Sequence, residues 1–327
     1  MIQKLSIRNF KSVRELDLSC RRVNVFIGEP NAGKTNILEA MGLRCGGCLL
    51  HASDVFRCST LADLFFDQDS KNQIGVGFDE SRMIIRVEKD DAVGVHLQAM
   101  GGHQAFRISS ELIASPNTFN LTDSGKAPEA KVYLFQAQPK LDVQANGCLL
   151  PPFGANLLHM LYSSKEVRVS ASGLFAPSGF RLNVDYTDKR LRVSKMVDDV
   201  LISFPYSTCS ETLRRMVFHH LAIDTNESSV LVFDEPEAHA YPPYTKILAE
   251  KMAKDDCGNQ FFLTTHSPYM LTSLIEKTPV DELNVILCRM ENFETKAYVM
   301  NEEQKGQLLE WGMSAFYNFD RLVDKES

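Results

Sequence analysis

Residues 28–35 carry the clearest chemical signal in this sequence. They read Gly-Glu-Pro-Asn-Ala-Gly-Lys-Thr and fit the phosphate-binding pattern G-x-x-x-x-G-K-[ST] at every fixed position. Glycine lets the backbone come close to phosphates, so that consecutive N–H groups can point at them. Lys34 would contact the β- and γ-phosphates of a nucleoside triphosphate, and the Thr35 hydroxyl would ligate Mg²⁺. The pattern therefore predicts a site that takes ATP and Mg²⁺.

The sequence on either side of this loop supports the prediction. An apolar, β-branched run at residues 23–27 is typical of a strand, and residues 37–41 give the following helix an apolar face. A helix that begins at Gly33 would present its N-terminal end, which favours anions, to the phosphates. The residues predicted to bind nucleotide are Gly28, Glu29, Pro30, Asn31, Ala32, Gly33, Lys34, Thr35 and Asn36.

Two adjacent carboxylates, Asp234 and Glu235, follow a fully apolar strand. In a phosphate-loop enzyme the first acid commonly holds Mg²⁺, and the second orients or deprotonates the attacking water. Such a pair is also common where a strand simply runs into a polar turn. Because this chain also carries a phosphate loop, the catalytic interpretation is favoured. A second apolar strand ends just before His266, at the sheet edge where open α/β folds bind ligands. We therefore predict Lys34, Glu235 and His266 as catalytic residues.

The composition is that of an ordinary globular protein. The chain has 327 residues, of which 44% are hydrophobic and 24% charged. Its net charge of −7 gives no overall attraction to nucleic acid or to an anionic membrane. The N-terminus alternates polar and apolar residues, and no run approaches the ~18 apolar residues of a membrane span. A cytoplasmic protein without a membrane partner is expected, with reduced cysteines.

Four residues of zinc-ligand type lie close together, namely Cys45, Cys48, His51 and Cys58. Their spacing matches no known zinc module, and isolated cysteines are commonly buried as small apolar residues. Burial is the favoured interpretation, and the metal site stays an alternative.

The elements that must position these residues alternate in type along the chain. Apolar strands separated by helices at both ends favour a parallel sheet covered on both faces. Period-two patterns in the middle favour antiparallel strands. Strands are expected at 5–9, 13–18, 131–135, 230–233 and 260–264, a meander at 73–108, further strands within 181–204, and helices at 61–66, 155–162, 207–223 and 244–253.

The order of the motifs resembles the ABC-type ATPases of the OLD/RecF-like branch, which are relatives of SMC heads. The resemblance rests on the opening Leu-Ser-Ile-Arg-Asn-Phe-Lys-Ser at 5–12, the loop at 28–35, Asp-Glu-Pro-Glu at 234–237 and Thr-His-Ser-Pro at 265–268. It implies an α/β fold of the P-loop NTPase type, an ABC-ATPase head. This head would have a mostly parallel core sheet, an antiparallel β-subdomain and a helical insertion.

The resemblance also implies how the chain is divided. Residues 1–327 would form a single head. Residues 1–58 and 205–327 would form the nucleotide-binding core, and residues 59–204 the β-rich and helical insertion.

Heads of this kind dimerise and hold two ATP molecules between the phosphate loop of one head and a signature segment of the other. By resemblance, residues 237–240 match the segment that the two heads press together. Gln136 or Gln138 matches a glutamine that joins Thr35 and Asp234 around Mg²⁺, and Gln136 is our choice.

The signature segment departs from the pattern of its relatives. They carry a serine and a glycine pair, or Asp-Gly, ahead of a long helix, whereas residues 206–215 contain no glycine. An ungapped comparison puts Cys209 at the serine position and Glu211 at the glycine. A shift by one lets Ser207 or Ser210 supply the hydroxyl. We predict Ser207, Ser210 and Glu211 as contacts to the partner's ATP.

The resemblance suggests three functions. The preferred one is an ATPase that switches a dimer and controls a separate effector, such as a nuclease or toxin, in bacterial anti-phage defence or a toxin-type pair. The last ~60 residues are too few for the Toprim nuclease that OLD proteins often carry. One alternative is a RecF-like DNA-repair ATPase with DNA as its partner. The other, favoured by the glycine-free signature, is a nucleotide-binding scaffold with little hydrolysis.

Overall fold

The computed structural model describes residues 1–45, 55–87, 93–99, 102–108, 130–137, 146–185 and 188–319. Its core is a six-stranded sheet in the order β15-β14-β3-β13-β12-β8, in which only β15 runs antiparallel to its neighbour. The strands are β3 (Val23–Gly28), β8 (Ala130–Tyr133), β12 (Val230–Phe233), β13 (Gln260–Thr264), β14 (Leu283–Glu291) and β15 (Glu294–Val299). Every residue of β3, β12 and β13 is buried, as expected for short apolar strands covered on both faces. The predicted parallel sheet is confirmed.

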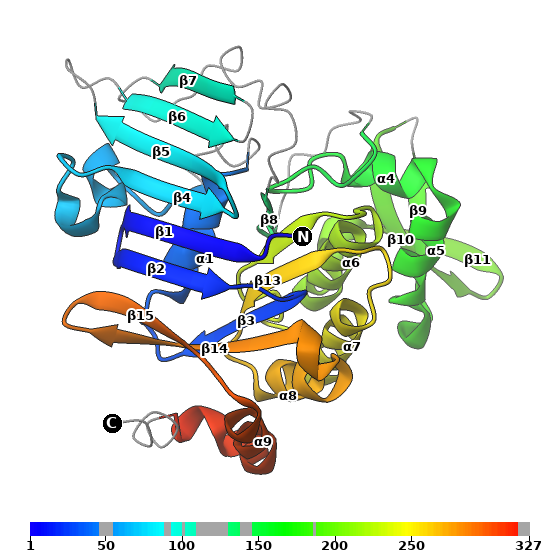
Figure 1. The fold of residues 1–327 in the computed structure, drawn as a ribbon. Coiled ribbons are helices and arrows are strands. Elements are labelled where there is room, and N and C mark those ends of the chain that lie inside the picture. The colour runs from blue at the N-terminus through cyan, green and yellow to red at the C-terminus, as the bar shows by residue number, and fades with distance from the viewer. Residues whose placement is uncertain are drawn as a thin grey trace.

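Alternate residues of these strands face two different layers. Val25 and Ile27 pack in a cluster with the helices α6 (Glu211–Asp224), α7 (Pro242–Ala253) and α8 (Pro268–Lys277). Phe26, between them, packs with α1 (Lys34–Gly42) and the antiparallel sheet on the opposite face. Figure 1 shows this arrangement, with α9 (Glu302–Trp311) near the C-terminal end. The loop after β3 therefore emerges from a sheet that is held on both sides.

The antiparallel sheet has the order β2-β1-β4-β5-β6-β7. Its strands are β1 (Lys4–Phe10), β2 (Val13–Ser19), β4 (Ile74–Phe78), β5 (Ser81–Val87), β6 (Val93–Ala99) and β7 (Gly102–Ile108). The two predicted N-terminal strands and the predicted meander are confirmed, and they form one sheet, because β1 pairs with β4. The helix expected at 61–66 is a 3-10 turn at Leu61–Leu64.

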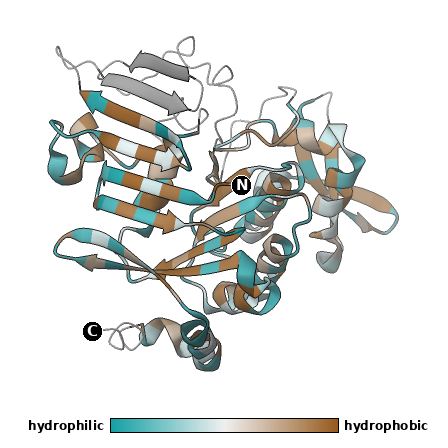
Figure 2. Cartoon of the chain, viewed as in Figure 1, coloured by the Kyte–Doolittle hydropathy of each residue, from teal (hydrophilic) through white to brown (hydrophobic). Residues whose placement is uncertain are grey.

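A smaller unit of helices α4 (Leu157–Ser163) and α5 (Lys165–Gly173) carries a third sheet. Its strands are β9 (Arg181–Asp185), β10 (Arg190–Val197) and β11 (Val200–Pro205), as predicted for 181–204. Leu191 and Val193 of β10 are buried in the main core cluster. Strand β11 is hydrophobic in Figure 2, although Val200 and Leu201 are 61% and 53% exposed.

Both predicted chain segments contribute to both large sheets. Strand β8 lies within 59–204, the predicted insertion, and forms an edge of the core sheet. The antiparallel sheet joins β1 and β2 to strands from 59–204. Across the described ranges, no helix is long and apolar enough to cross a membrane.

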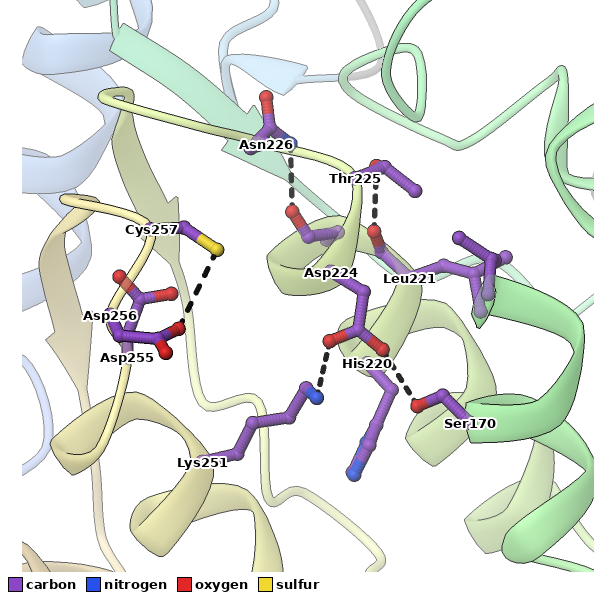
Figure 3. A network of polar contacts seen from close by, with 12 residues as sticks. Ser170, His220, Leu221, Asp224, Thr225, Asn226, Lys251, Asp255, Asp256 and Cys257 are labelled. Atoms are coloured by element: carbon purple, nitrogen blue, oxygen red, sulfur yellow. Dashed lines mark hydrogen bonds and ion pairs between the residues drawn. The ribbon is translucent and has the colours of Figure 1, made fainter. Parts of the chain in front are cut away.

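Helix α6 begins four residues later than predicted. A 3-10 turn at Tyr206–Thr208 precedes it, and Ser210 caps it, since the Ser210 hydroxyl accepts a hydrogen bond from the Leu213 N–H. Figure 3 shows the opposite end, where the Asp224 carboxylate binds Lys251 of α7 and accepts a hydrogen bond from Ser170 of α5. The helix is therefore anchored to two neighbours at its C-terminal end.

His219 lies inside α6 with no polar contact. It is 2% exposed, and neither ring nitrogen has a hydrogen-bond partner within the described part of the chain. The ring packs edge-on against Phe218 and Phe233, with centroid distances of 5.1 and 5.5 Å. Burial lowers the pKa of His219 to about 3.

Replacing His219 with leucine is expected to raise the free energy of unfolding by about 1 kcal/mol at pH 7, because an unpaired polar group leaves the core. The gain should grow below pH 6.5, where the unfolded chain's histidine takes up a proton that the folded protein excludes. Thermal melts of both proteins at pH 7 and pH 5 measure this. An equal gain at the two pH values would contradict the lowered pKa.

Candidate active site

The phosphate loop depends on its two glycines. Gly28 ends β3 with φ 142°, and a Cβ there would lie 2.2 Å from the backbone oxygen of Cys288 on the adjacent strand. Gly33 has φ 84°, and a Cβ there would lie 1.8 Å from the Thr295 hydroxyl. Both positions combine a left-handed conformation with close packing, so only glycine fits.

Lys34 lies inside this loop. It is 5% exposed, and its Nζ donates hydrogen bonds to the backbone oxygens of Gly28 (2.9 Å) and Glu29 (2.8 Å). Burial lowers the pKa of Lys34, and the nearby acids Glu235 and Asp234 oppose this shift. The ammonium is thus held against the backbone of the loop, and phosphate oxygens can replace the two carbonyls as its acceptors.

Asp234 joins the loop to two strands of the core sheet. Its Oδ1 accepts hydrogen bonds from the hydroxyls of Thr35 (3.1 Å) and Thr264 (2.5 Å). Burial raises the pKa of Asp234, and these two hydrogen bonds oppose the shift. The Thr35 hydroxyl and the Asp234 carboxylate are hard oxygen donors in contact, which suits Mg²⁺ that keeps several waters and phosphate oxygens as further ligands.

Glu235 and His266 face each other at the ends of β12 and β13. Glu235 Oε1 lies 3.5 Å from His266 Nε2, and the two side chains are 44% and 37% exposed. Glu235 has φ 45°, a left-handed conformation, and its N–H donates to the Thr264 hydroxyl at 2.9 Å. Burial, with a contribution from Lys34, lowers the pKa of His266. A neutral imidazole therefore stands beside the Glu235 carboxylate, and both can reach a ligand.

Lys34, Thr35, Glu235 and His266 line one pocket of about 370 Å³, and Asp234 is joined to it by its hydrogen bond with Thr35. That size lies within the range of small-molecule sites. Glu29 and Ala32, also predicted to bind nucleotide, line a neighbouring cavity of about 200 Å³. The residues that line the larger pocket are Ser12, Pro30, Asn31, Gly33, Lys34, Thr35, Asn36, Arg57, Glu235, His266 and Met290.

Two family models match the sequence. Residues 1–144 match an AAA ATPase domain, and residues 149–272 match an AAA domain described as putative AbiEii toxin, Type IV TA system. The curated proteins contain no match.

Solved structures match over nearly the whole chain. An SMC head bound to the C-winged helix domain of ScpA has a TM-score of 0.57 and 18% identity, and the match covers 93% of this chain and 99% of that one. An SMC head with an extended coiled coil, bound to the C-terminal domain of ScpA derived from Pyrococcus furiosus, has a TM-score of 0.54 and 14% identity, with coverage of 94% and 98%. The protein has the fold of an ABC-type ATPase head. At these identities the likeness concerns the fold alone.

Arg57 lines the phosphate-loop pocket, although no sequence motif predicted it. Its Nε donates to Glu39 Oε1 at 2.8 Å, and the side chain is 64% exposed. It lines the pocket with Lys34, and its charge partly opposes the rise that burial causes in the pKa of Asp234. A second cation therefore stands where an anionic ligand would bind.

Gln136 does not join Thr35 and Asp234 in the described structure. It lies three residues beyond β8, the parallel neighbour of β12, and so leaves the sheet at the same edge as Asp234. Its side chain lines a different cavity, and no hydrogen bond joins it to Thr35 or Asp234 in the described ranges. The alternative, Gln138, lies outside the described residues. The predicted three-ligand metal set is thus brought together only in part.

The predicted signature residues lie around the start of α6. Ser207 is exposed in the 3-10 turn, Ser210 is the helix cap, and Glu211 pairs with Arg215 at 2.8 Å. The Thr212 hydroxyl donates a hydrogen bond to the His239 backbone oxygen at 2.8 Å, and this bond links the start of α6 to the turn after Glu235. The segment therefore offers a helix N-terminus and two exposed serines without a glycine, and the Ser210 hydroxyl already caps the helix.

Glu237 is hydrogen-bonded to the chain segment that carries His266. It is 7% exposed, and its Oε1 accepts hydrogen bonds from the Thr265 hydroxyl and from the His266 N–H (3.2 Å). Its Oε2 is buried and has no partner among the described residues. Burial raises the pKa of Glu237 to about 7. The residue positions His266 through its backbone, a role that the sequence did not indicate.

Replacing Glu237 with glutamine is expected to stabilise the protein by about 2–3 kcal/mol at pH 8 and by little at pH 5. Between pH 4.5 and about 7 the folded protein keeps a proton that the unfolded chain has released, so wild-type stability falls as pH rises through this window. Glutamine stays neutral and keeps an acceptor for Thr265. Urea unfolding at both pH values measures the difference, and a constant difference would refute the raised pKa.

The cysteine cluster gives no metal site in the described structure. Cys45 is buried and Cys58 is partly buried, whereas Cys48 and His51 lie outside the described residues. No group of three metal-ligating side chains is found within the described ranges.

Proposed function

We propose that this protein binds and hydrolyses ATP. The observation that carries the proposal is the convergence of three separate segments on one pocket. Lys34, Thr35, Glu235 and His266 line it, and Asp234 is hydrogen-bonded to the Thr35 hydroxyl beside it. The matches to AAA ATPase domains and the ABC-type fold support it.

Each residue has a role that its surroundings fit. Lys34 binds phosphate oxygens with charge-assisted hydrogen bonds. Thr35 and Asp234 hold Mg²⁺, which when bound neutralises charge on the phosphates. Glu235 orients the attacking water and accepts its proton, and the neutral His266 donates a hydrogen bond to the water or the γ-phosphate. Arg57 adds positive charge at the mouth of the pocket.

We further propose that two heads close around ATP through Ser207, Ser210 and Glu211. Ser207 and Ser210 are exposed and lie at the N-terminal end of α6, where backbone N–H groups favour an anion. Light scattering tests this with Glu235→Gln, which is expected to hold ATP without hydrolysing it. The variant should be monomeric alone and dimeric with ATP and Mg²⁺. A variant that binds ATP and stays monomeric would refute the closed dimer.

We propose that the closing and opening of the dimer control a separate effector protein, a nuclease or a toxin. The second family model's description names a putative toxin of a toxin–antitoxin system, and both solved SMC heads are bound to domains of another protein. The net charge of −7 argues against DNA as the main partner. Co-purification with the products of neighbouring genes, with and without ATP, tests this. Recovery of DNA alone would favour the RecF-like function, and recovery of nothing would refute the effector.

A further inference from the structure

A second cavity, of about 530 Å³, lies between the end of β8 and the start of α6. Among the described residues, it shares no lining residue with the phosphate-loop pocket. Its volume suits a small organic molecule. The residues that line it are Phe135, Gln136, Ala137, Leu157, Arg190, Leu191, Arg192, Pro205, Tyr206, Ser207, Arg214 and Phe218.

The lining combines aromatic walls with one sign of charge. Phe135 and Phe218 meet edge to face, with ring centroids 5.9 Å apart. Three lining residues are arginines, and none of the lining residues that the structure describes is acidic. Of the nearby carboxylates, Glu211 is paired with Arg215, and Asp185 accepts a hydrogen bond from the Asp188 N–H at 3.0 Å. The described lining therefore combines arginine side chains with apolar walls.

The three arginines differ in how firmly they are held. Arg192 donates from Nε and Nη2 to the hydroxyl and backbone oxygen of Ser203, at 2.8 and 2.9 Å. Arg214 donates from Nη1 to the backbone oxygen of Ala137. Arg190 is exposed, and no ion pair involves it in the described structure. Arg192 and Arg214 are thus fixed cations, and Arg190 is free to reach a ligand.

Two hydrogen-bond donors of the lining residues have no acceptor. The Tyr206 hydroxyl and Arg214 Nε are buried and unpaired within the described ranges. Burial raises the pKa of Tyr206, so its hydroxyl keeps its proton at neutral pH. A buried donor without an acceptor costs free energy. A small rotation that brings either donor to an acceptor in the cavity is therefore favourable.

We propose that this cavity binds a small organic anion with an aromatic body, the class that includes aryl phosphates and nucleoside monophosphates. The anion pairs with Arg190 and Arg214, which as planar guanidinium groups suit phosphate and carboxylate. The aromatic body packs against Phe135 and Phe218. Residues 135–137 and α6 both bound the cavity. A bound molecule would therefore contact both the segment after β8 and the helix that follows the signature segment.

Calorimetric titration with 1-naphthyl phosphate tests the site, since this probe lacks the diphosphate that a phosphate loop grips. Saturable binding is expected, and 1-naphthol and inorganic phosphate should each bind at least about tenfold more weakly. Arg190→Gln should weaken binding about tenfold. Arg181→Gln, which changes another exposed arginine of the same sheet outside the cavity, should leave it unchanged.

Two more variants separate this cavity from other sites and from misfolding. Tyr206→Phe removes an unpaired hydroxyl, so it should melt no lower than wild type and still bind the probe about fivefold more weakly. Lys34→Ala should bind the probe as wild type does. The proposal is overturned if the probe does not bind the wild type. It is also overturned if the affinity is unchanged in both Arg190→Gln and Tyr206→Phe, or if Lys34→Ala no longer binds the probe. The titration needs no ATP hydrolysis, so it can fail while the ATPase proposal stands.

Discussion

Replacement of Lys34 with alanine is expected to weaken ATP binding by roughly 100-fold. The side chain is buried inside the phosphate loop, with Nζ 2.9 and 2.8 Å from the backbone oxygens of Gly28 and Glu29. No other described lysine lines the pocket, and the exposed Arg57 stands at its edge. The variant therefore loses the cation nearest to the phosphates. Equilibrium binding of a fluorescent ATP analogue measures the change.

Lys254→Ala provides the matched control for this experiment. Lys254 lies just beyond α7, is 64% exposed and pairs with Glu250 on the surface. Its loss should change neither ATP affinity nor the melting temperature by a measurable amount. If the Lys34→Ala variant folds and binds ATP as tightly as the control does, the loop does not hold the phosphates.

Replacement of Glu235 with glutamine is expected to slow the chemical step by about 10²- to 10⁴-fold and to leave ATP affinity within about threefold of wild type. Glutamine keeps the shape of the side chain and cannot take a proton from water. Asp234, Thr35 and Lys34 are untouched, so ATP and Mg²⁺ should still bind. Conversion of bound ATP to ADP under single-turnover conditions measures the step.

Glu227→Gln controls for the loss of one negative charge. Glu227 is exposed and lies near the opposite end of the same strand, β12, away from the pocket. It should convert ATP at the wild-type rate. A normal rate in Glu235→Gln as well would mean that another group accepts the proton, and His266, 3.5 Å away, would be the next candidate.

Much of the site could be predicted because its motifs are local. The phosphate loop needs glycine at positions 28 and 33 for backbone conformation, and the structure shows φ values of 142° and 84° there. Asp234 and Glu235 follow a strand whose continuous apolar character already indicated a buried parallel sheet. Parallel strands bring their carboxyl ends to one edge, so the motifs had to meet.

The remaining site residues act through contacts between distant segments, which no local pattern encodes. Thr264 joins Asp234 to the Glu235 backbone across two strands, and Glu237 holds Thr265 in the same way. Arg57 reaches the pocket from an irregular segment that carries no motif. These roles depend on strand order, which the sequence left open.

One predicted helix start is displaced in the structure, and one predicted site residue lies apart from the residues that it was expected to join. The helix expected from residue 207 begins at Glu211, because the chain leaves β11 through Pro205 and a 3-10 turn before Ser210 can cap α6. The same turn helps to enclose the second cavity, into whose lining Gln136 falls. The role of Gln136 as a magnesium ligand therefore stays a prediction.

Steady-state phosphate release by the wild-type protein, at saturating ATP and Mg²⁺, tests the central claim most directly when Glu235→Gln is measured beside it. A hydrolytic site built on Lys34, Asp234 and Glu235 predicts that wild type turns over at least about 100-fold faster than the variant and that removal of Mg²⁺ abolishes the difference. Wild-type turnover that stays at the level of a blank without protein would contradict the account and leave a nucleotide-binding scaffold in its place, whereas equal and fast turnover by both proteins would contradict only the role of Glu235.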